Sequence, residues 1–318
     1  MANEGILTQI SLAKETTVGT AVVPSISMAV LPSDGVVTEE EAVGVEGIDT
    51  SPALNKEFVQ GIREYNGAFE MNAFPQAIGY LMASAFGSVS SAAAGGETIV
   101  YDHDFVEVVT KTSVTLEQKI GSITERFAGF VASKFGIEIT VGEPIKFTFE
   151  GKALSKATAT AITASYEDSP VFDWTDIQSI TLGGTDIKDA LSELSLEYTN
   201  NLQNFHGLSG DSEPTNIYVE PSEVTGSITA YLDTNIKALQ AVFEAKTQQA
   251  LIITIQADET IGVASKNQLV ITVPKVVLNT YAYPIDTGYV EVTSDFVARQ
   301  DATDGLIKAT LTNLVASY

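Results

Sequence analysis

Cysteine is absent from this 318-residue chain, which excludes disulfides and thiolate metal sites. Histidine is almost as scarce, because only His103 and His206 are present. The sequence also lacks a GxSxG nucleophile elbow, an HExxH pair and a glycine-rich phosphate loop. We therefore assign no catalytic, cofactor-binding or metal-binding residues and expect no cofactor. The protein is not expected to be an enzyme.

A few short segments allow a functional interpretation beside a simpler one. Residues 101–105, around His103, are compatible with a metal site, but an exposed hairpin with solvated side chains is favoured. His206 is expected in a loop. Residues 301–305 have the oxygen ligands and turn glycine of a calcium loop, yet lack its remaining ligands, so a hairpin turn is favoured. Trp174, the only tryptophan, is expected to pack locally, with sugar stacking as the alternative.

Basic residues are also few: 17 lysines and arginines stand against 41 acidic residues, for a net charge of −24. A surface this negative repels nucleic-acid phosphates and anionic lipids, so sequence-specific DNA binding and membrane binding are not expected. No stretch approaches the roughly 20 apolar residues of a bilayer span. The N-terminal residues lack a basic region followed by an apolar run, and no cleavable secretion signal is expected.

Alternation of apolar and polar residues with a period of two dominates the chain and predicts a mainly β protein. Glycine turns lie where hairpins need them, at residues 141–144, 183–184 and 304–305. The clearest predicted strands are residues 137–141, 145–149, 192–198, 251–255, 269–273, 289–292 and 306–311.

Two segments show helical periodicity instead. Residues 75–86 begin with a proline and are followed by Gly87, a typical helix start and end. Residues 234–245 follow Asp233, which with Thr234 is a candidate N-cap. Each predicted helix has one apolar face and follows a predicted strand that begins at a glycine, Gly67 or Gly226.

This similarity indicates an internal repeat, because Gly67 and Gly226 lie 159 residues apart and later matches recur at about 140 residues. Chance alignment is the alternative. We expect two similar β-sandwich or barrel-like domains, residues 1–160 and 161–318, each with one flanking helix. The shorter later spacing reflects an insertion in the first copy at 88–111, predicted as a flexible loop at 88–96 followed by a hairpin at 98–109. Residues 157–164 are either a last strand of the first domain or a linker.

Several segments together resemble the tail tube proteins (major tail proteins) of long-tailed bacteriophages and prophages with non-contractile tails. These segments are residues 14–24, the strand–helix unit 67–87, residues 126–149, residues 194–202 and residues 298–313. The resemblance spans most of the chain, and its motifs are structural.

The resemblance implies a virion protein, made in the cytoplasm of the host bacterium, whose rings stack into a tube that conducts DNA during ejection. Its partners would be other copies of itself and the tape-measure, tail-tip and tail-terminator proteins, with no membrane partner. Single-domain members form sixfold rings, so a duplicated member would form a pseudo-hexameric trimer, and a hexamer is the alternative. Negative channel walls would let DNA pass without holding it.

One long acidic segment, residues 33–65, matches neither repeat and is predicted as a loop. In a protein that stacks as rings, this loop would contact the next ring or subunit. Its candidate contact residues are Glu39, Glu40, Glu41, Glu46 and Asp49.

Three other functions compete with a tail tube. Another virion protein, such as a capsid decoration or baseplate protein, would form compact assemblies that do not stack. A carbohydrate-binding β module would need clustered exposed aromatics. A carboxylate hydrolase has no supporting constellation of residues.

Overall fold

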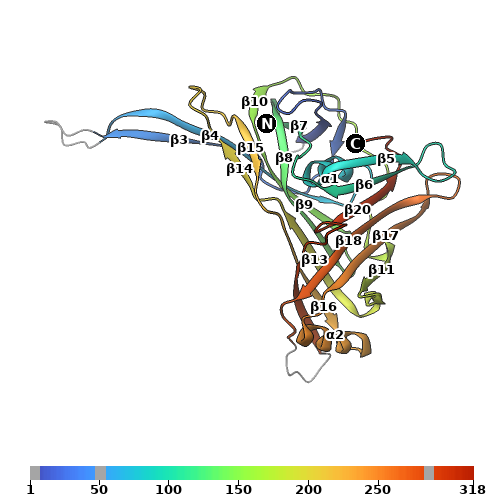
Figure 1. The fold of residues 1–318 in the computed structure, drawn as a ribbon. Coiled ribbons are helices and arrows are strands. Elements are labelled where there is room, and N and C mark those ends of the chain that lie inside the picture. The colour runs from blue at the N-terminus through green and yellow to red at the C-terminus, as the bar shows by residue number, and fades with distance from the viewer. Residues whose placement is uncertain (1–7, 47–54, 283–289) are drawn as a thin grey trace.

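The computed structural model describes residues 8–46, 55–282 and 290–318, and these residues are mainly β (Figure 1). The strands of the first half are β1 Gln9–Lys14, β2 Ile26–Met28, β3 Gly35–Glu46, β4 Asn55–Asn72, β5 Gly87–Ala93, β6 Tyr101–Glu107, β7 Val114–Ile120, β8 Ile123–Thr140, β9 Lys146–Ala153 and β10 Ser155–Thr158. Those of the second half are β11 Ile177–Leu182, β12 Thr185–Asp186, β13 Leu191–Thr199, β14 Leu202–Phe205, β15 Asn216–Val219, β16 Glu223–Tyr231, β17 Gln249–Thr260, β18 Lys266–Leu278, β19 Glu291–Ala298 and β20 Lys308–Asn313. The helices are α1 Ile78–Phe86 and α2 Thr234–Ala245, with short 3₁₀ turns at Trp174–Asp176 and Lys188–Ala190. The predicted fold class is confirmed.

A central antiparallel sheet runs through both halves of the chain in the order β3-β4-β9-β8-β13-β16-β19-β18. The two halves join where β8 pairs with β13, from Glu193 opposite Thr140 to Thr199 opposite Lys134. A second contact between the halves is the pairing of β6 with β20. Both halves therefore share continuous sheets.

Each half repeats the same set of strand pairings. In the first half β1 pairs with β2 and β7, β8 pairs with β7, β9 and β10, and β4 pairs with β3 and β9. In the second half β11 pairs with β12 and β17, β18 pairs with β17, β19 and β20, and β16 pairs with β13 and β19. One helix follows β4 and the other follows β16. The hairpins β5–β6 and β14–β15 are the additions that differ.

The strands before the two helices begin earlier than predicted, at Asn55 and Glu223, and Gly67 and Gly226 lie within them, where they have the same packing role. An added Cβ at Gly67 would meet the ring of Phe130, and one at Gly226 would meet the ring of Phe296. A phenylalanine ring therefore lies directly on each strand, where only glycine leaves room for it.

Both helices are close to their predicted positions. The second matches its prediction at both ends, and the Asp233 side chain accepts the Ile236 N–H at 2.7 Å as an N-cap. The first begins at Ile78, three residues later than predicted, because residues 75–77 form turns. α1 is almost wholly buried in the core, whereas α2 buries only Ile236 and Leu239 and lies at the lower end of the molecule in Figure 1.

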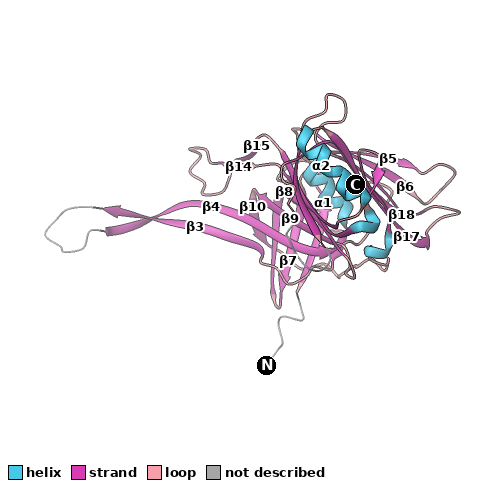
Figure 2. Cartoon of the chain, turned by 90° about the horizontal axis from the view of Figure 1, so that it is seen from below, coloured by secondary structure: helices cyan, strands magenta, loops and turns pink. Residues whose placement is uncertain are grey.

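The structure corrects two loop predictions. Most of the segment 33–65 is not a loop, because its described residues from Gly35 to Glu46 and from Asn55 onward form the paired strands β3 and β4. Their outer part projects from the body as a two-stranded ribbon (Figures 1 and 2). The start of the insertion 88–111 is strand β5 rather than a flexible loop, and it pairs with β6, so the hairpin begins earlier in the chain than predicted. In both places pairing with a partner strand overrides the weak local signal.

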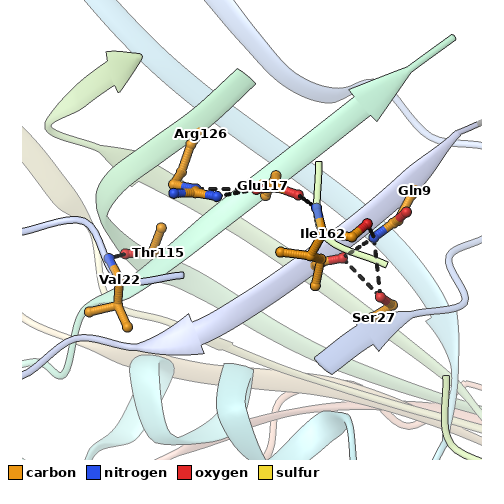
Figure 3. Close-up of polar contacts among 8 residues, drawn as sticks. Gln9, Val22, Ser27, Thr115, Glu117, Arg126 and Ile162 are labelled. Carbon is orange, nitrogen blue, oxygen red and sulfur yellow. Dashed lines mark hydrogen bonds and ion pairs between the residues drawn. The ribbon is translucent and has the colours of Figure 1, made fainter. Parts of the chain in front are cut away.

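The segment between the halves lies against a smaller sheet, which runs β2-β1-β7-β8-β10. The strand β10 ends at Thr158, so residues 157–164 are a strand only at their start. Beyond it, the Ile162 N–H donates to Glu117, and the Ile162 carbonyl accepts from Gln9 (Figure 3). Glu117 is buried and also accepts two N–H bonds from Arg126, at 2.6 and 3.2 Å. These polar contacts fasten the connection to the first half.

Candidate functional site

The outer face of the central sheet is a broad polar surface, which we call the polar face. Side chains alternate along each strand, so Phe135, Ile137 and Ile139 of β8 are buried while Lys134, Glu138 and Thr140 face outward. The same alternation holds on β9, β13 and β19. Carboxylates on this face are Glu64, Glu70, Glu138, Glu150, Glu193, Glu197, Glu223, Glu291 and Asp295.

The few lysines of the polar face are paired with carboxylates. Lys134 lies 2.8 Å from Glu197 and 3.3 Å from Glu150. Partial burial acts to lower the pKa of Lys134, but these two carboxylates hold it above its ordinary value. Lys146 and Lys152 are likewise within salt-bridge distance of Glu143 and Glu64. The lysines are therefore locally neutralised, and the face as a whole is negative.

The projecting ribbon, residues 40–46 of β3 with residues 55–62 of β4, is called the arm. Of the predicted contact residues, Glu39 lies at its base and Glu40, Glu41 and Glu46 lie along β3, all exposed; Asp49 lies outside the described residues. Glu39 accepts a hydrogen bond from Asn66 at 3.2 Å. Glu40 binds Arg63 of the opposite strand through two N–H bonds, at 3.0 and 2.8 Å. The structure thus places the four described glutamates on one strand.

The arm also exposes large apolar side chains, which the sequence analysis did not single out. Val43 and Val59 are directly opposite each other, and Phe58 is 63% exposed. Val45 and Ile62 are also exposed. A two-stranded ribbon is marginally stable in water by itself. Exposed apolar residues on such a ribbon are typical of a surface that another protein covers.

The second half supports the base of the arm. The backbone N–H of Arg63 donates to the Ser212 carbonyl at 2.8 Å, and the buried Tyr65 hydroxyl donates to the Glu213 carboxylate at 2.6 Å. Burial, together with this bond to Glu213, raises the pKa of Tyr65 to about 12. The hairpin β14–β15 occupies the place in the second half that the arm has in the first, between β13 and β16. It is visible beside the arm in Figure 1.

His103 and Trp174 differ from their predicted surroundings. His103 is not solvated: it is fully buried, with its ring nitrogens 2.8 Å from Ser91 Oγ and 3.1 Å from Asn313 Oδ1. Burial lowers the pKa of His103, so it is a neutral core residue. Trp174 is not packed away, since 43% of it is exposed beside a cleft of about 510 Å³.

The other two weak motifs lie where the sequence placed them. His206 follows β14 in a loop, as predicted. Residues 301–305 form the predicted turn, closed by two hydrogen bonds between Asp301 and Gly305. In the described part of the chain, no group of three or more potential ligand side chains is arranged to hold a metal ion. Within that same part, no helix is long and apolar enough to cross a membrane.

Two segments that resemble tail tube proteins meet at Glu15. This buried carboxylate accepts the hydroxyls of Ser113 and Thr115 at 2.7 and 2.8 Å and the N–H groups of Gly19 and Gly129 at 2.9 and 2.8 Å. Residues 14–24 and 126–149 are thereby tied together. These sequence motifs therefore have a structural role, because their hydrogen bonds connect separate segments of the first half.

Two comparisons with known proteins bear on the family of the chain. A search of curated proteins finds no significant match. The family model described as phage tail tube protein matches residues 5–298. This match covers nearly the whole chain, including the polar face and the arm. The chain therefore belongs to the phage tail tube protein family, and it is a structural virion protein whose copies assemble into a tail tube and contact other tail proteins.

Proposed function

We propose that three copies of this chain close into a ring with the polar face lining the central channel. The observation that carries the proposal is that one continuous sheet from both halves has a buried apolar side and a negative polar side. A negative wall repels DNA phosphates, so DNA passes without being retained. Each chain contributes two halves with matching strand pairings, and a ring of six such halves needs three chains.

The arm is proposed to contact the neighbouring ring. It projects beyond the body (Figures 1 and 2). It also combines exposed glutamates with exposed valine, isoleucine and phenylalanine side chains. Burial of an exposed phenylalanine stabilises an interface by about 1.5–3 kcal/mol. The end rings of the tube would contact the tape-measure, tail-tip and terminator proteins. Residues 1–160 and 161–318 are the two tube domains of this arrangement.

Negative-stain imaging of the purified chain tests this proposal. We expect hollow tubes, and averaged end views with threefold symmetry that approaches sixfold. Rings that never stack would favour a decoration or baseplate role. Rings with six chains would contradict the trimer, and a chain that remains monomeric at high concentration with initiator proteins present would contradict the channel.

A further inference from the structure

The central sheet has an open edge at each end. In the ring proposed above, on which the following pairing rests, these two edges of neighbouring copies would meet. At one end, β3 pairs with β4 alone among the described strands. At the other, residues 277–282 pair with β19 on one side, and their opposite side carries no strand within the described residues. An exposed strand edge is a template for pairing with another strand.

The chain already contains one junction of this kind. The strand β13 is the counterpart of β3, because Leu196 is opposite Gly226 as Val36 is opposite Gly67. On its other side β13 pairs with β8, the counterpart of β18. We infer that β3 of one chain pairs antiparallel with residues 277–282 of a second copy, as β13 pairs with β8 inside the chain.

The register follows from the tilt of the sheet. A row of paired residues crosses it from Met71 through Phe147, Ile137, Leu196, Gly226 and Phe296 to Leu278. This row meets β4 at Met71 but meets β16 at Gly226, the counterpart of Gly67. It therefore shifts by four residues, from 67 to 71, for each half that it crosses. A stagger of four residues over four strands corresponds to the tilt of about 36° that is usual in closed barrels.

The same shift of four residues carries the row into the second copy. Val36 is the counterpart of Leu196, so Leu278 is opposite the residue four positions after Val36, which is Glu40. A β-bulge follows, because the N–H groups of Asn279 and Thr280 both donate to the Asp295 carbonyl, at 2.7 and 3.4 Å. Counting past the bulge places Val37 opposite Ala282.

The chemistry of the two edges is complementary at this register. Inside the chain, Asn200 is the counterpart of Glu40, and its amide donates to the Ala132 carbonyl at 2.8 Å. The Glu40 carboxylate cannot donate a hydrogen bond as the Asn200 amide does. The opposing edge instead supplies a cation with which this carboxylate can pair. Lys246 Nζ donates to the Leu278 carbonyl at 2.9 Å, which places an ammonium group beside the position of Glu40 from the second copy.

The β3 edge is capped in the single chain. Gln118 Oε1 accepts the Val36 N–H at 2.7 Å, and this bond is buried. Leu196, the counterpart of Val36, lies in the β13 ladder with β8, opposite Ile137. The Gln118 side chain thus occupies the Val36 donor in the single chain, one residue beyond the inferred pairing of Val37 with Ala282. Such a cap limits premature edge-to-edge association.

Disulfide cross-linking tests the register, since the chain has no cysteine of its own. The variant carries Val37→Cys and Ala282→Cys, two exposed positions on opposite edges of one chain. We expect oxidised tubes to give covalent dimers and trimers that a reductant dissolves. The matched control carries Gly136→Cys and Glu197→Cys, the corresponding pair within the chain, and should close without joining chains. Each single-cysteine variant should form no series of covalent dimers and trimers.

A second measurement on unmodified tubes covers the case in which the double variant does not assemble. Zero-length coupling of amines to carboxylates, read by mass spectrometry on mixed ¹⁴N and ¹⁵N chains, should join Lys246 to Glu40 between different chains. Tubes that give neither this link nor the disulfide, while the control pair closes, would overturn the inferred pairing and leave the tube itself intact. A wild-type chain that forms no tube would instead contradict the proposed function.

Discussion

At the scale of single residues, buried polar side chains such as Glu15 and His103 are held by hydrogen bonds to their neighbours. Glu15 accepts four hydrogen bonds, and His103 lies between Ser91 and Asn313. A buried polar group costs free energy unless it is hydrogen-bonded. The scarcity of histidine and the absence of cysteine in the sequence anticipated this character, but not the burial of His103.

Glu167 gives the stability of the subunit a specific pH dependence. Its carboxylate accepts the N–H groups of Gln76 and Ala77, ahead of α1. Burial nevertheless raises the pKa of Glu167 to about 7, against about 4.3 in an unfolded chain. The folded state therefore favours the protonated form, and this stabilisation is complete below pH 4 and is lost as the pH rises through 7.

We predict that Glu167→Gln makes the free energy of unfolding less dependent on pH. Urea unfolding at pH 4.5 and pH 8 should show a smaller decrease in the variant than in the wild type, by about 3 kcal/mol at most. The comparison between proteins cancels the general repulsion among the other carboxylates. Glu259→Gln, at an exposed position near the end of β17, serves as control and should retain the wild-type difference. An unchanged difference in Glu167→Gln would contradict the assignment.

At the scale of elements, the arm shows where local sequence signals are insufficient. The run Thr38-Glu39-Glu40-Glu41 interrupts the apolar alternation, so the sequence predicts a loop. Pairing with β4 nevertheless extends the strand through this run, helped by the Glu40–Arg63 contact across the ribbon. Strand formation depends on the partner strand more than on intrinsic preference. The helix α2 is the opposite case, because its cap and apolar stripe are local and predicted both of its ends.

The arm provides a prediction about stacking. Phe58→Asp combined with Val59→Asp should leave the melting temperature of the subunit nearly unchanged, because both side chains are exposed in the single chain. Tube assembly should be reduced to single rings or short stacks, since charges replace apolar contacts at every arm. Calorimetry and measured tube lengths in negative stain provide the two readouts.

A matched variant separates this effect from a general change in surface charge. Val109→Asp with Val263→Asp replaces two valines that are 79% and 87% exposed outside the arm. This variant should form tubes of wild-type length. Arm variants that also stack to full length would show that the apolar residues of the arm do not contact the next ring.

At the scale of the whole molecule, the polar face gathers carboxylates on one side of the sheet, so that in the assembled tube they would lie together. Glu138, Glu193 and Glu291 are exposed carboxylates on three different strands of this face. In a closed ring, all copies of these residues would surround the same space. Replacement of all three by lysine should therefore make the tube retain short double-stranded DNA at low salt, and high salt should release it.

Co-sedimentation of fluorescent DNA with assembled tubes measures this retention. The control replaces Glu244, Asp258 and Glu259, exposed carboxylates outside the polar face, with lysine and so changes the net charge equally. Wild-type tubes should leave DNA in solution, and the control should retain several-fold less DNA than the polar-face variant. Equal retention by the two variants would place the polar face outside the channel.

The amino-acid sequence by itself determined the mainly β class, both helices, the negative charge and the spacing of Gly67 and Gly226, because these follow from local periodicity, capping and composition. Only the tertiary structure decided which carboxylates share a face, that residues 33–65 contain a projecting arm, and that β8 pairs with β13. These features depend on which strands meet, from 23 residues apart in the arm, as for Glu40 and Arg63, to 65 residues apart at the junction of the halves, as for Lys134 and Thr199. Strand pairing at such distances leaves no local pattern, since the ladder is made by backbone groups common to every residue.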